Sequence, residues 1–450
     1  MNSQPVSIVA VSIFFVVTQM TFANGGAWQT GVPVTGNAAA TDQKKSTNVT
    51  IEEENLTIDL HQEFAAVEVR YRMKNTGGQV EQDFFFPVER WAESDSEADP
   101  TTPSDLEGYA ISADGAELKV QTVNAKGEQP KPEKDRNGED YSAGRRLWKK
   151  SSIPFAQGQT REVLIRYRSP YAANQSSVSE DFHSEASYFR YSLSPAATWK
   201  GPIGKGTITV NYLHPLPEDI SIVTPKDRFK KINDTQFVWE FENLKPTLAD
   251  DLKIISHPAY EAYEMRREEG AEAQKPVPQV DYVIQGDRYF LQHTDYEATA
   301  SSTLKPNGDR TYDVDNIKVK YSDKTWAEGV DGDGIGESIT LKVRRSLPLH
   351  AIMIMPGYFS RENQALWGKN NRVAELEVTL NDEHTFSAKI PDEKLSADYP
   401  IPVRNYAKPV NTVKLTIKGV HKGTSARDTC ISALTLRSKL SEKPKVTPAR

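Results

Sequence analysis

Short segments in which apolar and polar residues alternate recur along most of the chain. Successive side chains of a β-strand point to opposite faces, so this alternation predicts strands with one buried face. In the N-terminal half it predicts strands at residues 67–74, 162–168, 207–212 and 237–242. Turn residues separate these segments. We therefore expect an all-β region, an antiparallel β-sandwich, over residues 47–258.

The alternating pattern resumes in the C-terminal half of the chain. It predicts strands at residues 338–343, 374–380 and 411–420. Residues 351–355 form a continuous apolar run, which is typical of a central strand that is buried on both faces. These segments predict a second β-sandwich over residues 285–440.

Several segments lack the alternation. Residues 259–284 are charged and rich in Ala, Glu and Arg, which are good helix formers, so we expect a short helix and linker between the sandwiches. Residues 24–46 and 441–450 predict a flexible leader and a disordered tail. The polar compositions of residues 92–106 and 124–147 predict long surface loops.

The N-terminus has the pattern of an export signal. Residues 7–17 are apolar, and Ala23 offers a small residue for cleavage. A retained membrane anchor is the alternative, but the apolar run is shorter than the roughly 20 residues of a membrane span. We expect residues 1–23 to be a cleaved signal peptide. The mature chain would then be secreted or periplasmic, without a transmembrane span.

Composition excludes some classes of partner. The 450 residues include 37% hydrophobic and 26% charged residues, which is typical of a globular protein, and the net charge is −7. An acidic chain is a poor ligand for phosphate backbones, so we do not expect nucleic acid as a partner. The single cysteine, Cys430, excludes an intramolecular disulfide. Nothing in the composition indicates the oligomeric state.

Motifs for catalysis are absent from the sequence. Residues 199–207 contain Gly204-Lys205, but Gly206 stands where a phosphate loop needs Ser or Thr, and a predicted strand follows. There is no H-E-x-x-H zinc motif and no G-x-S-x-G nucleophile motif. We therefore predict no catalytic residues and no enzyme activity. A pair of catalytic carboxylates leaves no local pattern in a sequence, so a hydrolase stays an alternative.

The stretch TWAEGVDGDGIGE, residues 325–337, combines glycine with acidic residues. It is not an EF-hand loop, because counting from Asp331 places Asp333 at the third position but Ile335 at the fifth. A different calcium site, formed by Asp331 and Asp333, is the one cofactor that the sequence suggests.

Five segments of the C-terminal half carry a family resemblance. They are ATASSTL (298–304), DKTWAEGVDGDGIGESITL (323–341), PGYFS (356–360), NNRVAELEV (370–378) and DTCISALTL (428–436). On these segments the C-terminal half resembles the NADase-type glycan-binding domain, a discoidin-like (F5/8 type C) family. The resemblance implies a galactose-binding-like jelly-roll sandwich that serves carbohydrate binding and toxin delivery. It does not imply NAD glycohydrolase activity, because no glycohydrolase domain is recognisable.

Residues 56–77, 84–89 and 191–210 carry a second likeness. On these residues the N-terminal half is weakly similar to secreted bacterial domains of unknown function of the DUF4424 type. It implies export and an all-β fold, and no activity.

A glycan site requires aromatic rings that stack on sugar C–H faces, beside polar groups that bind hydroxyls. The family resemblance places such residues in loops of the second sandwich. Structural roles are the alternative: Trp326 would then fill the core, and Glu337 would pair with Arg372. The candidate ligand-binding residues are Trp326, Glu337, Tyr358, Trp367, Asn371 and Arg372.

Three functions remain open from the sequence. The first is an exported, non-catalytic protein that binds a glycan or cell-surface polysaccharide. The second is a structural or adhesion protein of the cell envelope, which predicts a large exposed apolar patch. The third is a hydrolase with its catalytic carboxylates in the N-terminal half.

Overall fold

The computed structural model describes twelve segments of the chain: residues 39–40, 47–88, 106–123, 133–134, 140–141, 147–171, 175–178, 181–264, 280–308, 310–320, 322–395 and 398–445. The described elements are almost all strands, with one α-helix, α1 (Ala365–Lys369), so the all-β fold class is confirmed. The predicted signal peptide lies outside the described residues. None of the described helices has the length and apolarity to span a membrane.

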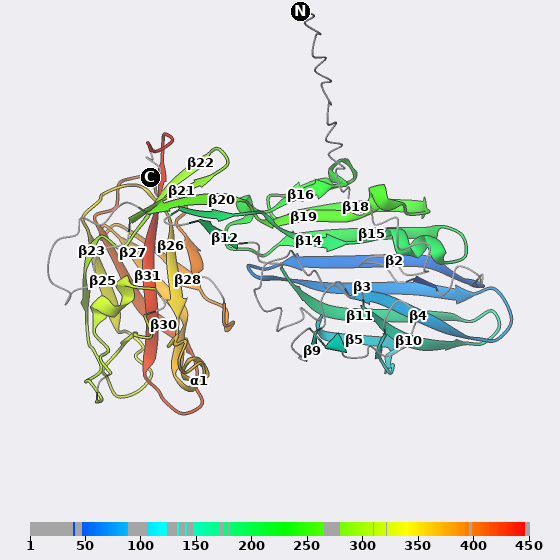
Figure 1. The fold of residues 1–450 in the computed structure, drawn as a ribbon, viewed down its shortest axis with the longest axis horizontal. Helices are drawn as coiled ribbons and strands as arrows, with labels where there is room; N and C mark the ends of the chain where they lie inside the picture. The colour runs from blue at the N-terminus through cyan, green and yellow to red at the C-terminus, as the bar shows by residue number, and fades with distance from the viewer. Residues whose placement is uncertain are drawn as a thin grey trace, which may run out of the picture.

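The N-terminal region (β1–β19) is built on an eight-stranded sheet (Figure 1). The predicted strand 67–74 lies in β3, where Val67, Val69, Tyr71 and Met73 are buried. Neighbouring strands are antiparallel except for β2 and β15, which are parallel. In spatial order the strands are β17 (Lys230–Asn233), β18 (Gln236–Leu244), β15 (Ile203–Tyr212), β2 (Val49–Leu60), β3 (Phe64–Asn75), β11 (Thr160–Pro170), β5 (Glu107–Ala113) and β6 (Ala116–Glu117).

Smaller sheets complete the N-terminal region. One contains β1 (Ala39–Ala40), β4 (Val80–Val88), β10 (Leu147–Phe155) and β7 (Gln121–Val123). Another contains β14 (Ser187–Tyr191), β19 (Leu252–His257) and β16 (Ser221–Thr224). β8 (Glu133–Lys134) pairs with β9 (Asp140–Tyr141). β1 lies in the expected leader, and β8 and β9 lie in an expected long loop, so these short strands correct the predictions at those positions. Most other residues of the leader and of the two long loops lie outside the described residues. The 3₁₀-helices are η2 (Ser194–Thr198), η3 (Pro217–Asp219), η4 (Lys226–Arg228) and η5 (Leu248–Asp250).

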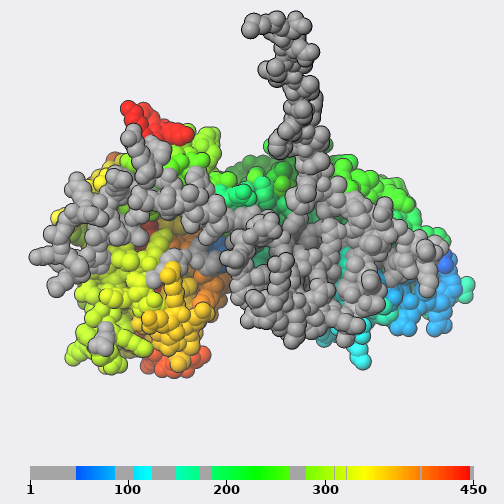
Figure 2. All heavy atoms as spheres, viewed as in Figure 1, coloured from blue at the N-terminus to red at the C-terminus, as the bar shows by residue number. Residues whose placement is uncertain are grey.

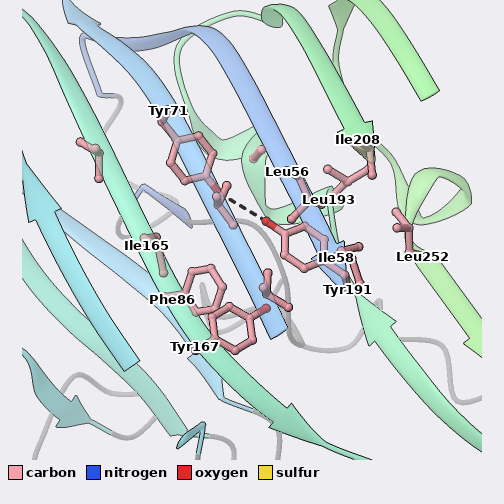
Figure 3. Packing of buried hydrophobic residues seen from close by; sticks show 14 of the residues in the cluster. Leu56, Ile58, Tyr71, Phe86, Ile165, Tyr167, Tyr191, Leu193, Ile208 and Leu252 are labelled. Carbon is pink, nitrogen blue, oxygen red and sulfur yellow. Dashed lines mark hydrogen bonds between the residues drawn. The ribbon is translucent and has the colours of Figure 1, made fainter. Parts of the chain in front are cut away.

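The N-terminal core is rich in aromatic side chains. Figure 3 shows Tyr71 and Tyr191 facing each other, with their hydroxyl oxygens 3.5 Å apart. Phe86 packs against Tyr167, with ring centroids 5.3 Å apart. Rings from the eight-stranded sheet and from the smaller sheets thus meet in a single buried cluster.

The C-terminal region (β21–β31) has a separate core of mainly Ile, Leu and Val. The predicted strands 338–343, 351–355, 374–380 and 411–420 coincide with β25, β26, β27 and β30. The region also contains η6 (Val314–Lys318). Its strands are β21 (Val280–Gln285), β22 (Arg288–His293), β23 (Tyr296–Ala300), β24 (Trp326–Ala327), β25 (Ser338–Val343), β26 (Leu349–Pro356), β27 (Asn371–Leu380), β28 (His384–Lys389), β29 (Tyr399–Pro402), β30 (Thr412–His421) and β31 (Thr429–Leu440).

The connection between the regions corrects the prediction of a helical linker over 259–284 at its two ends, whereas residues 265–279 lie outside the described residues. Its described ends are strands, β20 (Tyr260–Glu264) and β21, and these pair with each other. β20 also pairs with β13 (Asp181–Ser184), which pairs with β12 (Gln175–Val178). Helix propensity is a weak preference, and partner strands on both sides override it here. A shared sheet therefore joins the regions, which lie side by side in Figures 1 and 2.

Candidate functional site

The loop at residues 329–337 lies at the end of the C-terminal region that is remote from β20–β22 (Figure 1). Gly332, Gly334 and Gly336 have φ angles of 122°, 68° and 94°, which other residues rarely adopt. A side chain at Gly334 would also collide with Glu328. The glycines therefore allow the loop to fold tightly over Glu328.

Glu328 is a fully buried carboxylate beneath this loop. Its Oε1 accepts a hydrogen bond from the backbone N–H of Thr429 at 3.0 Å, and its Oε2 accepts one from Val330 at 2.9 Å. Burial raises the pKa of Glu328 despite these bonds. The side chain ties the loop to the start of β31.

Asp333 ties the same loop to two other segments. Its Oδ1 accepts hydrogen bonds from Asn371 Nδ2 at 3.0 Å and from Arg427 Nε at 3.4 Å. Its Oδ2 accepts one from the Lys422 ammonium. These bonds, that of Lys422 first, lower the pKa of Asp333 to about 2. The loop, β27 and the β30–β31 connection thus meet at one carboxylate.

Arg372 is the second centre of this arrangement. Nε and Nη2 bind both oxygens of Asp392, at 2.7 and 3.1 Å. Nη1 donates to the carbonyl oxygens of Trp367 and Asn370, at 3.1 and 3.0 Å. The guanidinium carbon lies 4.3 Å from the centroid of the Trp367 ring. We call Asp333, Asn371, Arg372 and Asp392 the loop junction.

Two predicted aromatic contacts are wrong. Trp326 is 0% exposed, and its Nε1 donates to the carbonyl of Ser302 at 3.1 Å. Tyr358 is 5% exposed and packs in a small cluster with Ala327 and Cys430. Neither ring can stack on a sugar from this position, because apolar neighbours already cover it. The structural alternative holds for Trp326, which fills the core.

The other four candidates divide into buried and accessible residues. Asn371 and Arg372 are buried and hold loops together, which corrects their expected role as direct ligand contacts. Glu337 is half-buried and accepts a hydrogen bond from Ser301 Oγ at 2.6 Å. Trp367 is half-buried, with Arg372 over its ring. The carboxylate partner of Arg372 is Asp392 and not Glu337.

The structure also corrects the expected calcium site. Asp331 is exposed, whereas the carboxylate of Asp333 is occupied by Lys422, Arg427 and Asn371. Two cationic groups at the same carboxylate oppose a divalent cation there. Among the described residues, no three His, Cys, Asp or Glu side chains are grouped to hold a metal.

The sequence interpretation missed Glu328, Asp392, Lys422 and Arg427. The contacts of Asp333 with Lys422 and Arg427 span 89 and 94 positions, so no local spacing indicates them. A weak signal exists in the stretch HKGTSARD, residues 421–428, where two cations flank small turn residues directly after the predicted strand 411–420.

Exposed side chains lie on the loop at residues 329–337 and on the β30–β31 connection, and we call five of them the rim. Val330 and Ile335 are 40% and 55% exposed, although both are apolar. The side chains of Lys422 and Arg427 are 62% and 73% exposed. The rim consists of Val330, Asp331, Ile335, Lys422 and Arg427.

Residues 289–437 match the family model of the NAD glycohydrolase translocation F5/8 type C domain. The resemblance of the C-terminal half to this family is therefore confirmed, and so is its discoidin-like fold. The DUF4424-type resemblance of the N-terminal half stays a prediction. No curated protein matches the chain.

Solved structures give only distant likenesses. CpGH89CBM32-4 of Clostridium perfringens, in complex with GlcNAc-α-1,4-galactose, is 13% identical, covers 32% of this chain and 90% of its own, and has a TM-score of 0.21. The M1 zinc metallopeptidase of Deinococcus radiodurans is 10% identical over 55% of this chain and 52% of its own, with a TM-score of 0.23. Yeast LTA4 hydrolase with bestatin is 13% identical over 49% and 30%, with a TM-score of 0.24. The chain thus spans about half of the length of the Deinococcus protein and less than a third of the yeast protein, and TM-scores this low carry no argument on function.

Proposed function

We propose that residues 285–440 form a glycan-binding module and that the rim makes the contacts. The observation that carries this proposal is the coincidence of two features. In the matched F5/8 type C domain, hydrogen bonds of Asp333 and Asn371 tie three segments together, and exposed side chains stand on two of these segments. A site whose segments are already held by hydrogen bonds loses little flexibility on binding, which favours affinity.

The rim offers the groups that a sugar requires. Lys422 and Arg427 donate hydrogen bonds to hydroxyl or carboxylate oxygens, and Asp331 accepts them from hydroxyls. Val330 and Ile335 offer apolar surface to sugar C–H groups. Trp367 and Glu337 remain proposed contacts at the edge of the rim, because both are half-buried rather than enclosed.

We further propose that the protein is exported and non-catalytic, with its partner a glycan or polysaccharide outside the cytoplasm. The apolar segment at residues 7–17 supports export. The absence of catalytic motifs from the sequence supports a binding role. The fold family supports it as well, since its name describes the translocation of an enzyme and not the enzyme itself.

The test is a glycan-array screen of the full-length protein, in calcium and in chelator. We expect specific binding in both buffers. Arg427→Gln and Ile335→Ser should each weaken binding at least fivefold. The matched control is Lys342→Gln, which removes an exposed cation from β25 away from the rim, and it should bind normally.

An empty array from a protein with a normal far-UV circular dichroism spectrum would overturn the glycan proposal. A protein-contact role would then become the leading function. Loss of binding in chelator would show a calcium requirement that the loop junction does not predict.

A further inference from the structure

The outer face of the eight-stranded sheet carries rows of polar side chains that backbone pairing places side by side. In one row, Asp59 of β2 lies opposite Ala66 of β3, and Ala66 lies opposite Arg168 of β11. Arg168 in turn lies opposite Glu107 of β5. The row therefore has the carboxylate of Asp59 on one side of Ala66 and the guanidinium of Arg168 on the other, and the small alanine side chain leaves space between them.

Ala66 forms the middle of an open hollow of about 530 Å³. The register of β5 and β11 shifts between Arg166 and Arg168, and Gly108 has a φ of 62°, so the sheet is irregular at one wall. Bulges of this kind often lie beside functional sites. The volume falls within the range of roughly 300–1,000 Å³ that is typical of small-molecule sites.

The two charged groups beside Ala66 are held in place without being paired with each other. Asp59 Oδ1 accepts a hydrogen bond from Asn211 at 2.7 Å, and Asn211 accepts one from Gln236 at 3.0 Å. The Arg168 guanidinium lies 4.6 Å from the centroid of the Phe64 ring. Within the described part of the chain, neither Asp59 nor Arg168 forms a salt bridge.

The next row of the hollow differs, because its charges neutralise one another. Glu68 binds Arg166 at 2.6 Å and Arg70 at 2.7 Å. The charges available to a ligand are therefore the carboxylate of Asp59 on one side of Ala66 and the guanidinium of Arg168 on the other. Glu107, beside Arg168, disfavours a ligand with only negative charge.

We propose that this hollow binds a small zwitterion, an α-amino acid or a dipeptide with free termini. Its ammonium would lie against Asp59 and its carboxylate against Arg168. Two inter-strand spacings place the Cα atoms of Asp59 and Arg168 roughly 9–10 Å apart, with Ala66 between them. A short ligand with one charge of each sign matches this arrangement, because each charge can form a charge-assisted hydrogen bond with the opposite charge of the sheet.

The test is calorimetry with the full-length protein and three probes: glycine, glycylglycine and triglycine. N-acetylglycylglycine and glycylglycinamide each lack one terminal charge. We expect saturable binding of glycine or glycylglycine, at least tenfold weaker binding of both blocked dipeptides, and weaker binding of triglycine.

Substitutions in the hollow test whether the ligand binds there. Ala66→Leu fills the hollow, and Arg168→Gln and Asp59→Asn each remove one charge, so each should weaken binding at least tenfold. The control is Arg72→Gln, on the same sheet face but outside the hollow, where Arg72 pairs with Glu52 at 3.4 Å. It should bind normally.

Three results would overturn the zwitterion site. They are no saturable binding below roughly 10 mM, equal binding of the blocked dipeptides, or full binding by Ala66→Leu. All four variants should keep the glycan binding of the wild type, because the rim lies in the other region. Failure of one proposal therefore leaves the other standing.

Discussion

The N-terminal sheet face and the C-terminal loop junction both gather charged side chains, but they do so in opposite ways. On the sheet face, backbone pairing sets the positions: Glu68 meets Arg166 because the two are register partners, and both are accessible. At the loop junction, the buried Arg372 side chain binds backbone carbonyl groups and so sets the course of the loops. The comparison teaches that burial and bonds to the backbone decide how much an ion pair contributes to stability.

The largest expected effect concerns the core of the C-terminal region. Trp326→Ala should lower the free energy of unfolding of the C-terminal region by about 3–5 kcal/mol, because it leaves a cavity in the core. Urea unfolding followed by circular dichroism measures this. Trp367→Ala, in a half-buried ring, should cost clearly less. Equal costs would contradict the distinction between a core ring and a surface ring.

A second prediction compares the regions through pH. Burial lowers the pKa of His214, in the N-terminal region, and of His293, in the C-terminal region, each to about 4. Unfolded histidine titrates near 6.5, so between pH 6.5 and 4 the unfolded state binds protons that the folded state does not. Each region should therefore lose roughly 2–3 kcal/mol of stability on acidification to pH 4.

The measurement is the urea midpoint of unfolding between pH 7 and 5. Most carboxylates titrate below this range, so the pH dependence within it reports mainly on histidines. His214→Gln should reduce the pH dependence of the N-terminal transition, and His293→Gln that of the C-terminal transition. An unchanged slope in either variant would show that its histidine is protonated in the folded protein.

A third prediction tests the opening comparison directly. Arg372→Gln should destabilise the C-terminal region by about 2 kcal/mol, because it releases Asp392 and removes the donor of two partly buried carbonyl groups. Glu68→Gln removes a carboxylate with two arginine partners, Arg70 and Arg166. It should change the free energy of unfolding by less than about 0.5 kcal/mol, because these ion pairs are exposed to solvent. If the two variants lost similar amounts of stability, burial and backbone bonds would not distinguish the two kinds of ion pair.

The smallest expected effect on stability is at the rim. Val330→Ser and Ile335→Ser replace exposed apolar side chains, so each should change the free energy of unfolding by less than about 0.5 kcal/mol. Both should nevertheless weaken glycan binding. A rim variant that destabilised the domain as much as Arg372→Gln would show that rim and junction are not separable.

The strands could be predicted because alternation is a local pattern. Val67, Val69, Tyr71 and Met73 are buried as expected, and so are Val163, Ile165 and Tyr167 of β11. The linker could not be predicted, because residues 260–264 have helix-forming composition and become a strand only through distant partners, β13 and β21. Pairing between such distant segments has no local signature.

The candidate site residues stay a prediction as ligand contacts, but the structure shows which of them lie together. Asp333 of the glycine-rich loop binds Asn371, which adjoins Arg372 in β27. Which face each side chain would take could not be predicted, because Trp326 enters the core through the pairing of β24 with β31. The cations at Asp333 come from a connection about 90 residues away in sequence, as the spans of 89 and 94 positions show.

The shared sheet between the regions has a practical consequence for anyone who divides the protein. β21 pairs with β20 on one side and with β22 on the other. A fragment that starts at residue 285 would lose all but the last residue of β21 and leave β22 as a bare edge, with free N–H and C=O groups that invite aggregation. A fragment that starts at residue 280 would still leave β21 unpaired on its other side. The glycan site is therefore best studied in the intact chain.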